Sequence, residues 1–508
     1  MNRTIAIAVA LGLLLGGGMA GASITPAVAG HARPSADANE TMLQLKQAMS
    51  DASNGDSKKA APELDKVIAS PDFDPLPAEL RFQTLYVATI IAFQDKQFDK
   101  AHRLAIRATG FDQATGAAWT ARLFSALYTS DNPDAGRCVE AMAKQWPEQL
   151  DNVRPQGVAQ THFALRAAHE DDVDRAMLDA LFDANWQAQY SDYDTLWRDL
   201  ALLQIEHNDA ARAATVARRI RSAHAAMSMR IDKRFDPITR GQSQAFDVDH
   251  LLDAEIQAAR ARVKTHPDQL RLVQRLQDLL IEKGQNAEVL LVSDAAVAHA
   301  ERGDGEKTYT DFSEAYNWVL NQRSLAFAHD GRWDDAVREM ARAARRPEDG
   351  GFNVSQSINL ADLLADLGQP DKAAAAIVES GEMSPNGHMQ LEYARLQIAI
   401  EKNDTGSVAK HMAYMQEHRT DDIGTWQRAL LKHGDLDAAA ALLIQRLQAP
   451  DWRSDALAEM QHYASTEQTP AMKTMEQRWN AVTSRADVQT ALAKVGRVER
   501  FDLVAPAF

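Results

Sequence analysis

The fold is decided by a short segment that ends one helix and begins the next, Gly331-Arg332-Trp333-Asp334-Asp335-Ala336. The segment recurs as Gly368-Gln369-Pro370-Asp371-Lys372-Ala373 and as Gly434-Asp435-Leu436-Asp437-Ala438-Ala439, with less perfect copies at 96–101, 132–135 and 284–287. A tight turn between antiparallel helices needs a residue that tolerates positive φ, and the helix after it needs a small residue where it crosses its partner. Ala101 and Ala135 are 34 residues apart, and Ala336 and Ala373 are 37 apart. This period predicts a helical hairpin that repeats along the chain.

The sequence around these turns has the pattern of amphipathic helices. Leu360, Leu363, Leu364 and Leu367 recur at the spacing of one helix face. The 508 residues contain only 25 Gly and 17 Pro, and alternating runs of β-branched residues are nearly missing. A lone hairpin cannot bury its apolar face, so the pairs must stack on one another. The chain is therefore expected to be all-α, a solenoid of roughly ten to thirteen antiparallel helix pairs.

The repeat resembles that of the tetratricopeptide repeat (TPR) family. The residues that carry the resemblance are Ala361, Leu364, Gly368, Ala373, Ile377 and Pro385 in one unit, and Leu320, Ser324, Phe327, Gly331, Ala336 and Ala343 in another. The resemblance covers about residues 40–465 and implies a right-handed superhelix with a concave inner groove. Most units lack the consensus Trp and Tyr of the family. In that family the positions of Asn317, Asn321, Asn359 and Asp362 face the groove, so these four are candidate ligand contacts.

The amino-terminal segment predicts export. Arg3 precedes an apolar run at 5–15, and Ala27-Val28-Ala29 is typical of a signal-peptidase site, with cleavage after Ala29 and 20–22 as the alternative. The protein is therefore expected in the periplasm or outside the cell, with no integral membrane segment after signal removal. The expected organisation is a signal peptide (1–29), a linker (30–40), a first array (41–228), an irregular insertion (229–249), a second array (250–465) and capping helices with a tail (466–508).

The net charge and the cysteine content of the chain disfavour several classes of function. There are 71 Asp and Glu against 55 Lys and Arg, a net charge of -16, which disfavours nucleic acid as a partner. Cys138 is the single cysteine, so neither an intrachain disulfide nor a paired-cysteine metal site can form. The usual zinc-protease, serine-hydrolase and phosphate-loop motifs are absent. The sequence therefore predicts no catalysis, no cofactor and no metal.

Two further features each have two interpretations. The segment 230–237 is either a loop packed across the array or a basic lip that presents Lys233 and Arg234 to an anionic ligand. Trp186, Tyr190, Tyr193 and Trp197 are spaced as a helical stripe that would stack on sugar rings or peptide side chains. They are packed in the core instead if a new helix begins near residue 191.

A second resemblance leads to a different function. Glu379-Ser380 and Gly387-His388-Met389-Gln390 look like a shortened lytic-transglycosylase motif, which would make Glu379 the general acid of a glycan-cleaving enzyme. The favoured hypothesis is an exported scaffold whose groove binds a protein, a peptide or an envelope polysaccharide. An accessory subunit of an envelope export or assembly machine is the alternative.

Overall fold

The computed structural model describes residues 36–187, 193–241, 244–348, 350–377, 381 and 383–505. They form two compact units, with the boundary between His207 and Asn208. The sequence suggested a division at 229–249, and short helices occupy part of that segment. The signal peptide, its cleavage site at Ala29 and the candidate acid Glu379 all lie outside the described residues.

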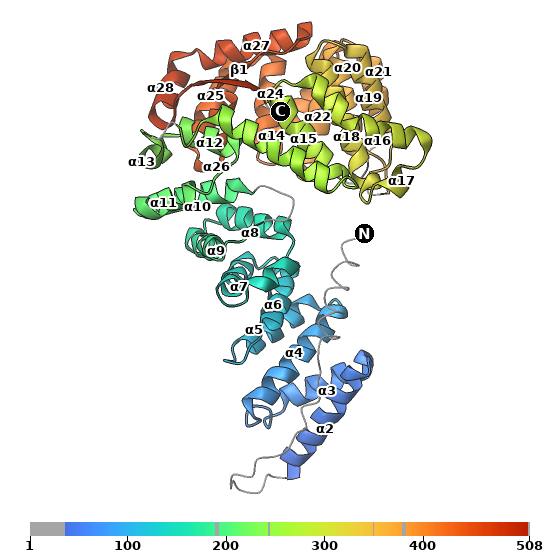
Figure 1. The fold of residues 1–508 in the computed structure, drawn as a ribbon, viewed down its shortest axis with the longest axis vertical. Helices are drawn as coiled ribbons and strands as arrows, with labels where there is room; N and C mark the ends of the chain where they lie inside the picture. Colours follow the sequence, from blue (N-terminus) through green and yellow to red (C-terminus); the bar gives the residue numbers. More distant parts are fainter. Residues whose placement is uncertain are drawn as a thin grey trace. The chain divides into compact units, whose positions relative to one another are not determined.

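The first unit is built of helices (Figure 1). They are α2 (Ala36–Ser53), α3 (Ser57–Ala69), α4 (Ala78–Gln94), α5 (Phe98–Thr109), α6 (Gly116–Thr129), α7 (Asn132–Gln145), η1 (Pro147–Asn152), α8 (Pro155–Ala167), α9 (Asp171–Asp183) and α10 (Asp194–Glu206). Neighbouring helices pack as antiparallel pairs, and each pair stacks on the next.

The second unit contains more helices and two short strands. Its first part is α11 (Ala210–Ala217), α12 (Ala223–Ile231), η2 (Lys233–Phe235), α13 (Asp236–Thr239), α14 (Val248–Thr265), α15 (Leu270–Glu282), α16 (Asn286–Arg302), α17 (Gly305–Thr308), α18 (Phe312–His329) and α19 (Trp333–Ala344). Its second part is α20 (Val354–Asp366), α21 (Pro370–Ala376), α22 (Pro385–Glu401), α23 (Thr405–Glu417), α24 (Ile423–His433), α25 (Leu436–Gln448), α26 (Pro450–Glu459), β1 (His462–Ala464), α27 (Pro470–Thr483), α28 (Ala486–Val495) and β2 (Arg500–Val504). The predicted all-α array of helix pairs is confirmed in both units.

The turns inside the pairs have the backbone that the sequence predicted. Positive φ occurs at Gly331, Gly368 and Gly434, and also at non-glycine residues in equivalent turns, namely Lys96, Ser130, His169 and Asn403. Five residues after a turn stands a residue with no exposed surface; examples are Ala60, Ala101, Ala135, Asp174, Val289, Ala336, Ala373 and Ala439. The positive-φ residue and this buried residue together fix the repeat register.

The residue twelve positions earlier, on the first helix, meets this buried residue where the two helices cross. In one pair both are alanines, Ala361 and Ala373. In others a polar side chain donates to the backbone of the second helix: Ser324 Oγ to Ala336 O at 2.7 Å and Gln427 Nε2 to Ala439 O at 2.9 Å. In these three pairs the crossing point therefore holds either small side chains or a satisfied hydrogen bond.

The second unit is closed by contacts between its beginning and its end, which we call the clasp (residues 227–236 with 457–504). Within the end segment β1 pairs in parallel with β2, and Figure 1 shows the red α28 beside the green α12 and α13 of the beginning. Arg497 donates to the Arg230 carbonyl and pairs with Asp236, and its backbone N–H donates to Ile231 O at 3.0 Å. The insertion and the tail, which the sequence treated separately, are thus parts of one interface.

None of the helices in the described ranges is long and apolar enough to cross a membrane.

Candidate binding surfaces

The two basic residues of the predicted lip are engaged inside the clasp. Lys233 Nζ donates to the Ala493 carbonyl, and Arg234 Nη2 lies 2.7 Å from Asp232 Oδ2. The segment is packed rather than free, as in the first of the two interpretations. An anionic ligand would have to compete with these internal partners.

The aromatic residues near the end of the first unit form a core cluster. Trp197 is 4% exposed, and its ring centroid lies 6.4 Å from that of Trp186 and 5.7 Å from that of Phe182. Tyr193 lies 6.3 Å from Trp186, and Tyr190 falls outside the described residues. Trp197 on α10 therefore packs in the core instead of offering its ring face to a sugar.

The four polar residues predicted to face the groove lie in one row on α18 and α20 and pair with their neighbours. Asn359 Nδ2 donates to Asn321 Oδ1 at 2.9 Å, and Asn317 Nδ2 donates to Gln356 Oε1 at 3.3 Å. Gln397 Nε2 on α22 donates to Asp362 Oδ1 at 3.0 Å. The structure thus brings the four residues together, and their hydrogen bonds join the first helices of successive pairs. Whether they also contact a ligand stays a prediction.

Charged side chains extend this row. Burial raises the pKa of Asp278 to about 6, that of Glu282 to about 7 and that of Asp362 to about 7, against the lowering effect of nearby arginines. The guanidinium of Arg428 lies 4.4 Å from the Tyr393 ring centroid, where it also faces Asp362. The row is a polar layer inside the second unit, and burial moves the pKa values of these three carboxyl groups toward neutral pH.

Replacing Asp362 with asparagine is expected to stabilise the second unit at pH 8. The pKa of Asp362 is higher in the folded chain than its usual 3.8, so ionisation costs folding free energy as the pH rises from about 4 to about 7. Asparagine keeps an acceptor for Gln397 and does not ionise. The gain is about 1 kcal/mol for each unit of pKa shift that the substitution removes.

Thermal melts at pH 4 and pH 8 test this expectation. The advantage of Asp362→Asn should appear at pH 8 and shrink at pH 4. The control is Asp371→Asn, since that carboxylate is 93% exposed and pairs with Lys402 on the surface. An equal gain at both pH values, or none at pH 8, would contradict the assignment.

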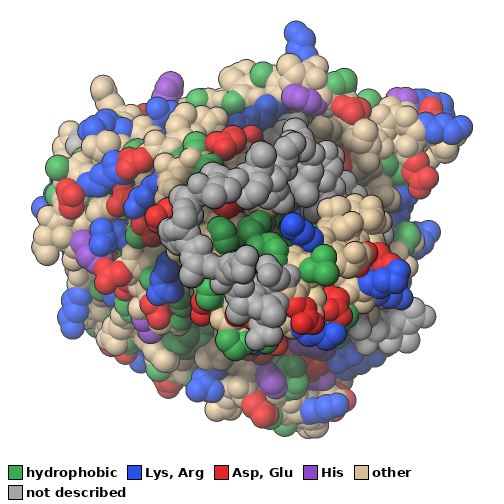
Figure 2. Space-filling model, turned by 90° about the horizontal axis from the view of Figure 1, so that it is seen from below, with side chains coloured by type: hydrophobic (Ala, Val, Ile, Leu, Met, Phe, Trp, Pro, Cys, Tyr) green, Lys and Arg blue, Asp and Glu red, His purple; other side chains and the backbone are tan. Residues whose placement is uncertain are grey.

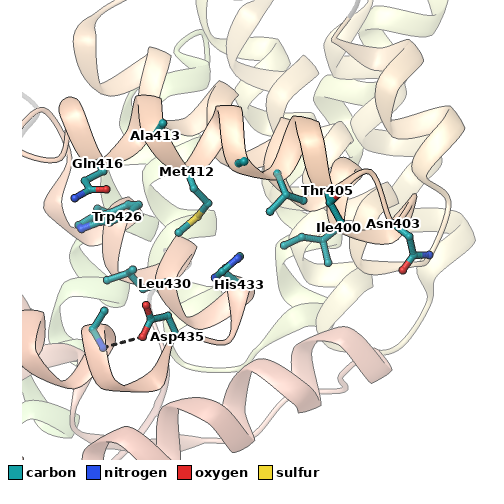
Figure 3. Close-up of a pocket in the computed structure, with 13 residues that line it drawn as sticks. Ile400, Asn403, Thr405, Met412, Ala413, Gln416, Trp426, Leu430, His433 and Asp435 are labelled. Atoms are coloured by element: carbon teal, nitrogen blue, oxygen red, sulfur yellow. Dashed lines mark hydrogen bonds between the residues drawn. The ribbon is translucent and has the colours of Figure 1, made fainter.

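A pocket of about 710 Å³ opens between α23 and α24 (Figure 3). Its walls are mostly apolar; the lining residues are Ile400, Asn403, Thr405, Val408, Ala409, Met412, Ala413, Gln416, Trp426, Leu430, His433, Asp435 and Ala438. Met412 lies between Trp426 and His433, and Asn403 lies at the opposite end from Gln416. Within the second unit this surface is accessible, because Ala409 and Ala413 are exposed.

The pocket lies beside a helix pair that differs from the others at its crossing. Leu396 and Val408 occupy the two crossing positions, where other pairs have a small residue or a hydrogen bond. Val408 is half-buried, whereas Ala336 and Ala373 at the same position are fully buried. Helix α23 packs mainly on α22 and leaves the face toward α24 uncovered. The sequence analysis missed this site; its signal is Val408, five residues after the positive-φ turn at Asn403.

Three further observations on the described residues concern metal binding, thiol reactivity and surface charge. No group of three or more His, Cys, Asp or Glu side chains that could hold a metal occurs in the part of the chain that the structure describes. Burial raises the pKa of Cys138 well above its usual value, which disfavours the reactive thiolate. On the face shown in Figure 2, Lys and Arg side chains lie among Asp and Glu side chains rather than in one basic region.

Comparison with known proteins yields only distant likenesses. No protein-family model matches the chain, and no curated protein matches it. Among solved structures it is similar to the APC/C hetero-tetramer Cut9–Hcn1 (13% identity, 90% of this chain and 96% of that one, TM-score 0.22). It is also similar to Naa15/Naa10 bound to HypK-THB (10%, 83% and 70%, 0.21) and to yeast Tom70 (11%, 82% and 99%, 0.20). At these TM-scores the likenesses carry no weight, and the TPR-like fold is established by the helix pairs themselves.

Proposed function

We propose that this chain is an exported, non-enzymatic scaffold that binds a protein partner in the α23–α24 pocket. The observation that carries the proposal is the uncovered apolar face of α23 within an otherwise closely packed array. Grooves between helices bind peptide helices and protein surfaces through such apolar stripes. The polar row and the clasp, by contrast, use their side chains to hold the second unit together.

Export is part of the proposal because of the apolar run at 5–15 and the small residues before position 30. The mature protein would then begin at Gly30 and meet its partner in the periplasm or outside the cell. Mass spectrometry of the protein from the periplasmic or secreted fraction tests this part. An intact Met1 in a cytosolic fraction would refute it.

The binding function is tested by affinity purification of the full chain from intact cells after chemical cross-linking. A recurring protein partner is expected, and its recovery should fall about tenfold with Ala413→Arg, which places a bulky cation in the pocket. Ala441→Arg is the matched control, because Ala441 is exposed on α25 and does not line the pocket. Equal recovery with both variants would reject the pocket as the binding site.

A further inference from the structure

We infer that the α23–α24 pocket receives an amphipathic helix of a partner protein, with a Lys or Arg beside its apolar face. This inference rests on the proposed function and specifies the partner's chemistry. It is carried by the shape of the pocket, by the pattern of its walls and by the charge on one side of it.

The walls present two helical stripes to the same opening. On α23 the lining residues recur at spacings of three and one, from Thr405 to Gln416, and so occupy one face of the helix. At a rise of about 1.5 Å per residue this stripe is roughly 16 Å long. On α24 the lining residues Trp426, Leu430 and His433 follow at spacings of four and three. The α24 stripe is shorter, roughly 10 Å at the same rise per residue. The two stripes face one groove, and we infer a third helix as its occupant.

Small side chains on α23 favour a helix, rather than an extended segment, as the occupant of the pocket. Ala409 and Ala413 are one helical turn apart and exposed, so another helix can approach the α23 backbone closely there. Met412 lies between them and α24, and its unbranched side chain adapts to different apolar partners. In the α18–α19 pair the positions equivalent to Ala409 and Ala413 are Val337 and Ala341, which are half-buried, and Val337 packs against the residues of the next pair. The partner helix would take the place of that cover.

The charge of the pocket selects a cationic partner. Asp435 is the one Asp or Glu among the thirteen lining residues, and no Lys or Arg is among them. Its Oδ1 accepts from Ala438 N at 3.0 Å, which fixes the carboxylate at the start of α25 beside Leu430. The whole chain carries a net charge of -16, which adds to the attraction at long range. A Lys or Arg at the border of the apolar face would meet the Asp435 carboxylate.

The experiment is photo-cross-linking from residue 413 in the full-length chain, in cells that produce the protein. A photoreactive amino acid replaces Ala413, and the same amino acid at Ala441 is the control. Mass spectrometry then identifies the linked segment of the partner. We expect a segment with apolar residues at helical spacing and a Lys or Arg beside them, linked from 413 and not from 441.

The linked segment is next made as a peptide, and its affinity for the purified protein is measured. Ala413→Arg should weaken binding about tenfold. Asp435→Asn should weaken it about two- to fivefold, because asparagine keeps the helix cap and removes the charge. The same peptide with Glu in place of the Lys or Arg should bind the wild type more weakly than the original peptide does. This difference in affinity between the two peptides should shrink with Asp435→Asn. Circular dichroism of each variant confirms that it is folded.

Several results would overturn the inference. The first is a linked segment that is proline-rich or lacks the basic residue. The second is a peptide whose affinity does not change with Asp435→Asn. The third is a small molecule, instead of a protein segment, linked from residue 413. If proteins are captured but are linked only from other positions of the array, the inference that the pocket binds a helix is refuted, whereas the proposed scaffold function is kept. If no protein is captured by cross-linking at any position, the proposed function itself fails.

Discussion

Replacing His162 with alanine is expected to lower the stability of the first unit by about 3–5 kcal/mol. His162 has no exposed surface, and it stands at the crossing position of α8 opposite Asp174 of α9. Its Nδ1 lies 2.8 Å from Asp174 Oδ1 and its Nε2 lies 3.0 Å from Asp199 Oδ2 on α10. One imidazole ring thus joins three helices, and its removal leaves two carboxylates without this buried partner.

The pH dependence of this effect follows from the shifted pKa of His162. Burial alone would lower it, but the hydrogen bonds to Asp174 and Asp199 outweigh burial and raise the pKa of His162 from 6.5 to about 9. The stabilisation by the charged ring is complete below pH 6.5 and is lost as the pH rises to about 9. The wild type should therefore lose stability over this range, and His162→Ala should lose much less.

Hydrogen exchange at pH 5.5 and urea melts at pH 5.5 and 9.5 check both statements. The variant should lose amide protection in α8, α9 and α10, with little change in α18–α22. Gln160→Ala is the control, because Gln160 is exposed on the same helix. A wild type whose stability is flat from pH 6.5 to 9 would mean that His162 is neutral in the folded chain.

The repeat could be predicted from the sequence because its turns follow local rules. Glycine marks the turn at Gly331, Gly368 and Gly434, and the alanine five residues later marks the crossing. The repeats of the first unit are harder to recognise in the sequence, because Lys96 and Ser130 adopt positive φ without being glycine. Positive φ at a non-glycine residue costs free energy, which the packing of the surrounding helices offsets. The sequence alone does not show that packing.

The polar row on α18 and α20 shows why the candidate binding surfaces could be predicted only in part. Asn321 and Asn359 lie on the first helices of their pairs, and their mutual hydrogen bond depends on how the pairs stack, which the sequence does not show. The pocket lies beside a helix pair in which large aliphatic side chains, Leu396 and Val408, occupy both crossing positions. Two such positions carry too little signal when the repeat itself is irregular. The pocket emerges only when α23 is seen to leave α24 uncovered.

The clasp had no local signal at all, because its partners are separated by more than half of the chain. Arg497 and Asp236 are 261 residues apart, and Arg230 and Glu499 are 269 apart. Each segment taken alone has the composition of a charged loop. Only the closure of the helix array brings the two together, so the basic residues were interpreted as a possible ligand lip.

The second prediction with a large expected effect concerns the clasp. Arg497→Ala should destabilise the contact between 227–236 and 457–504 by about 3 kcal/mol. The guanidinium pairs with Asp236 and donates to the Arg230 carbonyl, and alanine removes both interactions. Amide protection should fall in these two segments, and trypsin should cleave faster after Lys233. Helices α18–α22 should keep their protection, because they are held by their own hydrogen bonds between helices.

A methyl group at Gly496 tests the same interface without changing any charge. A Cβ there would lie 2.8 Å from the Ile231 carbonyl oxygen, so Gly496→Ala must push the two segments apart, at a cost of about 1–3 kcal/mol. Gly424→Ala adds the same methyl where the nearest atom, Asp422 Oδ1, is 3.5 Å away, and it should leave the clasp closed. If Arg497→Ala and Gly496→Ala expose the same two segments, close packing and ion pairing hold one interface. Exposure by Arg497→Ala alone would mean that the backbone contact at Gly496 contributes nothing to closure.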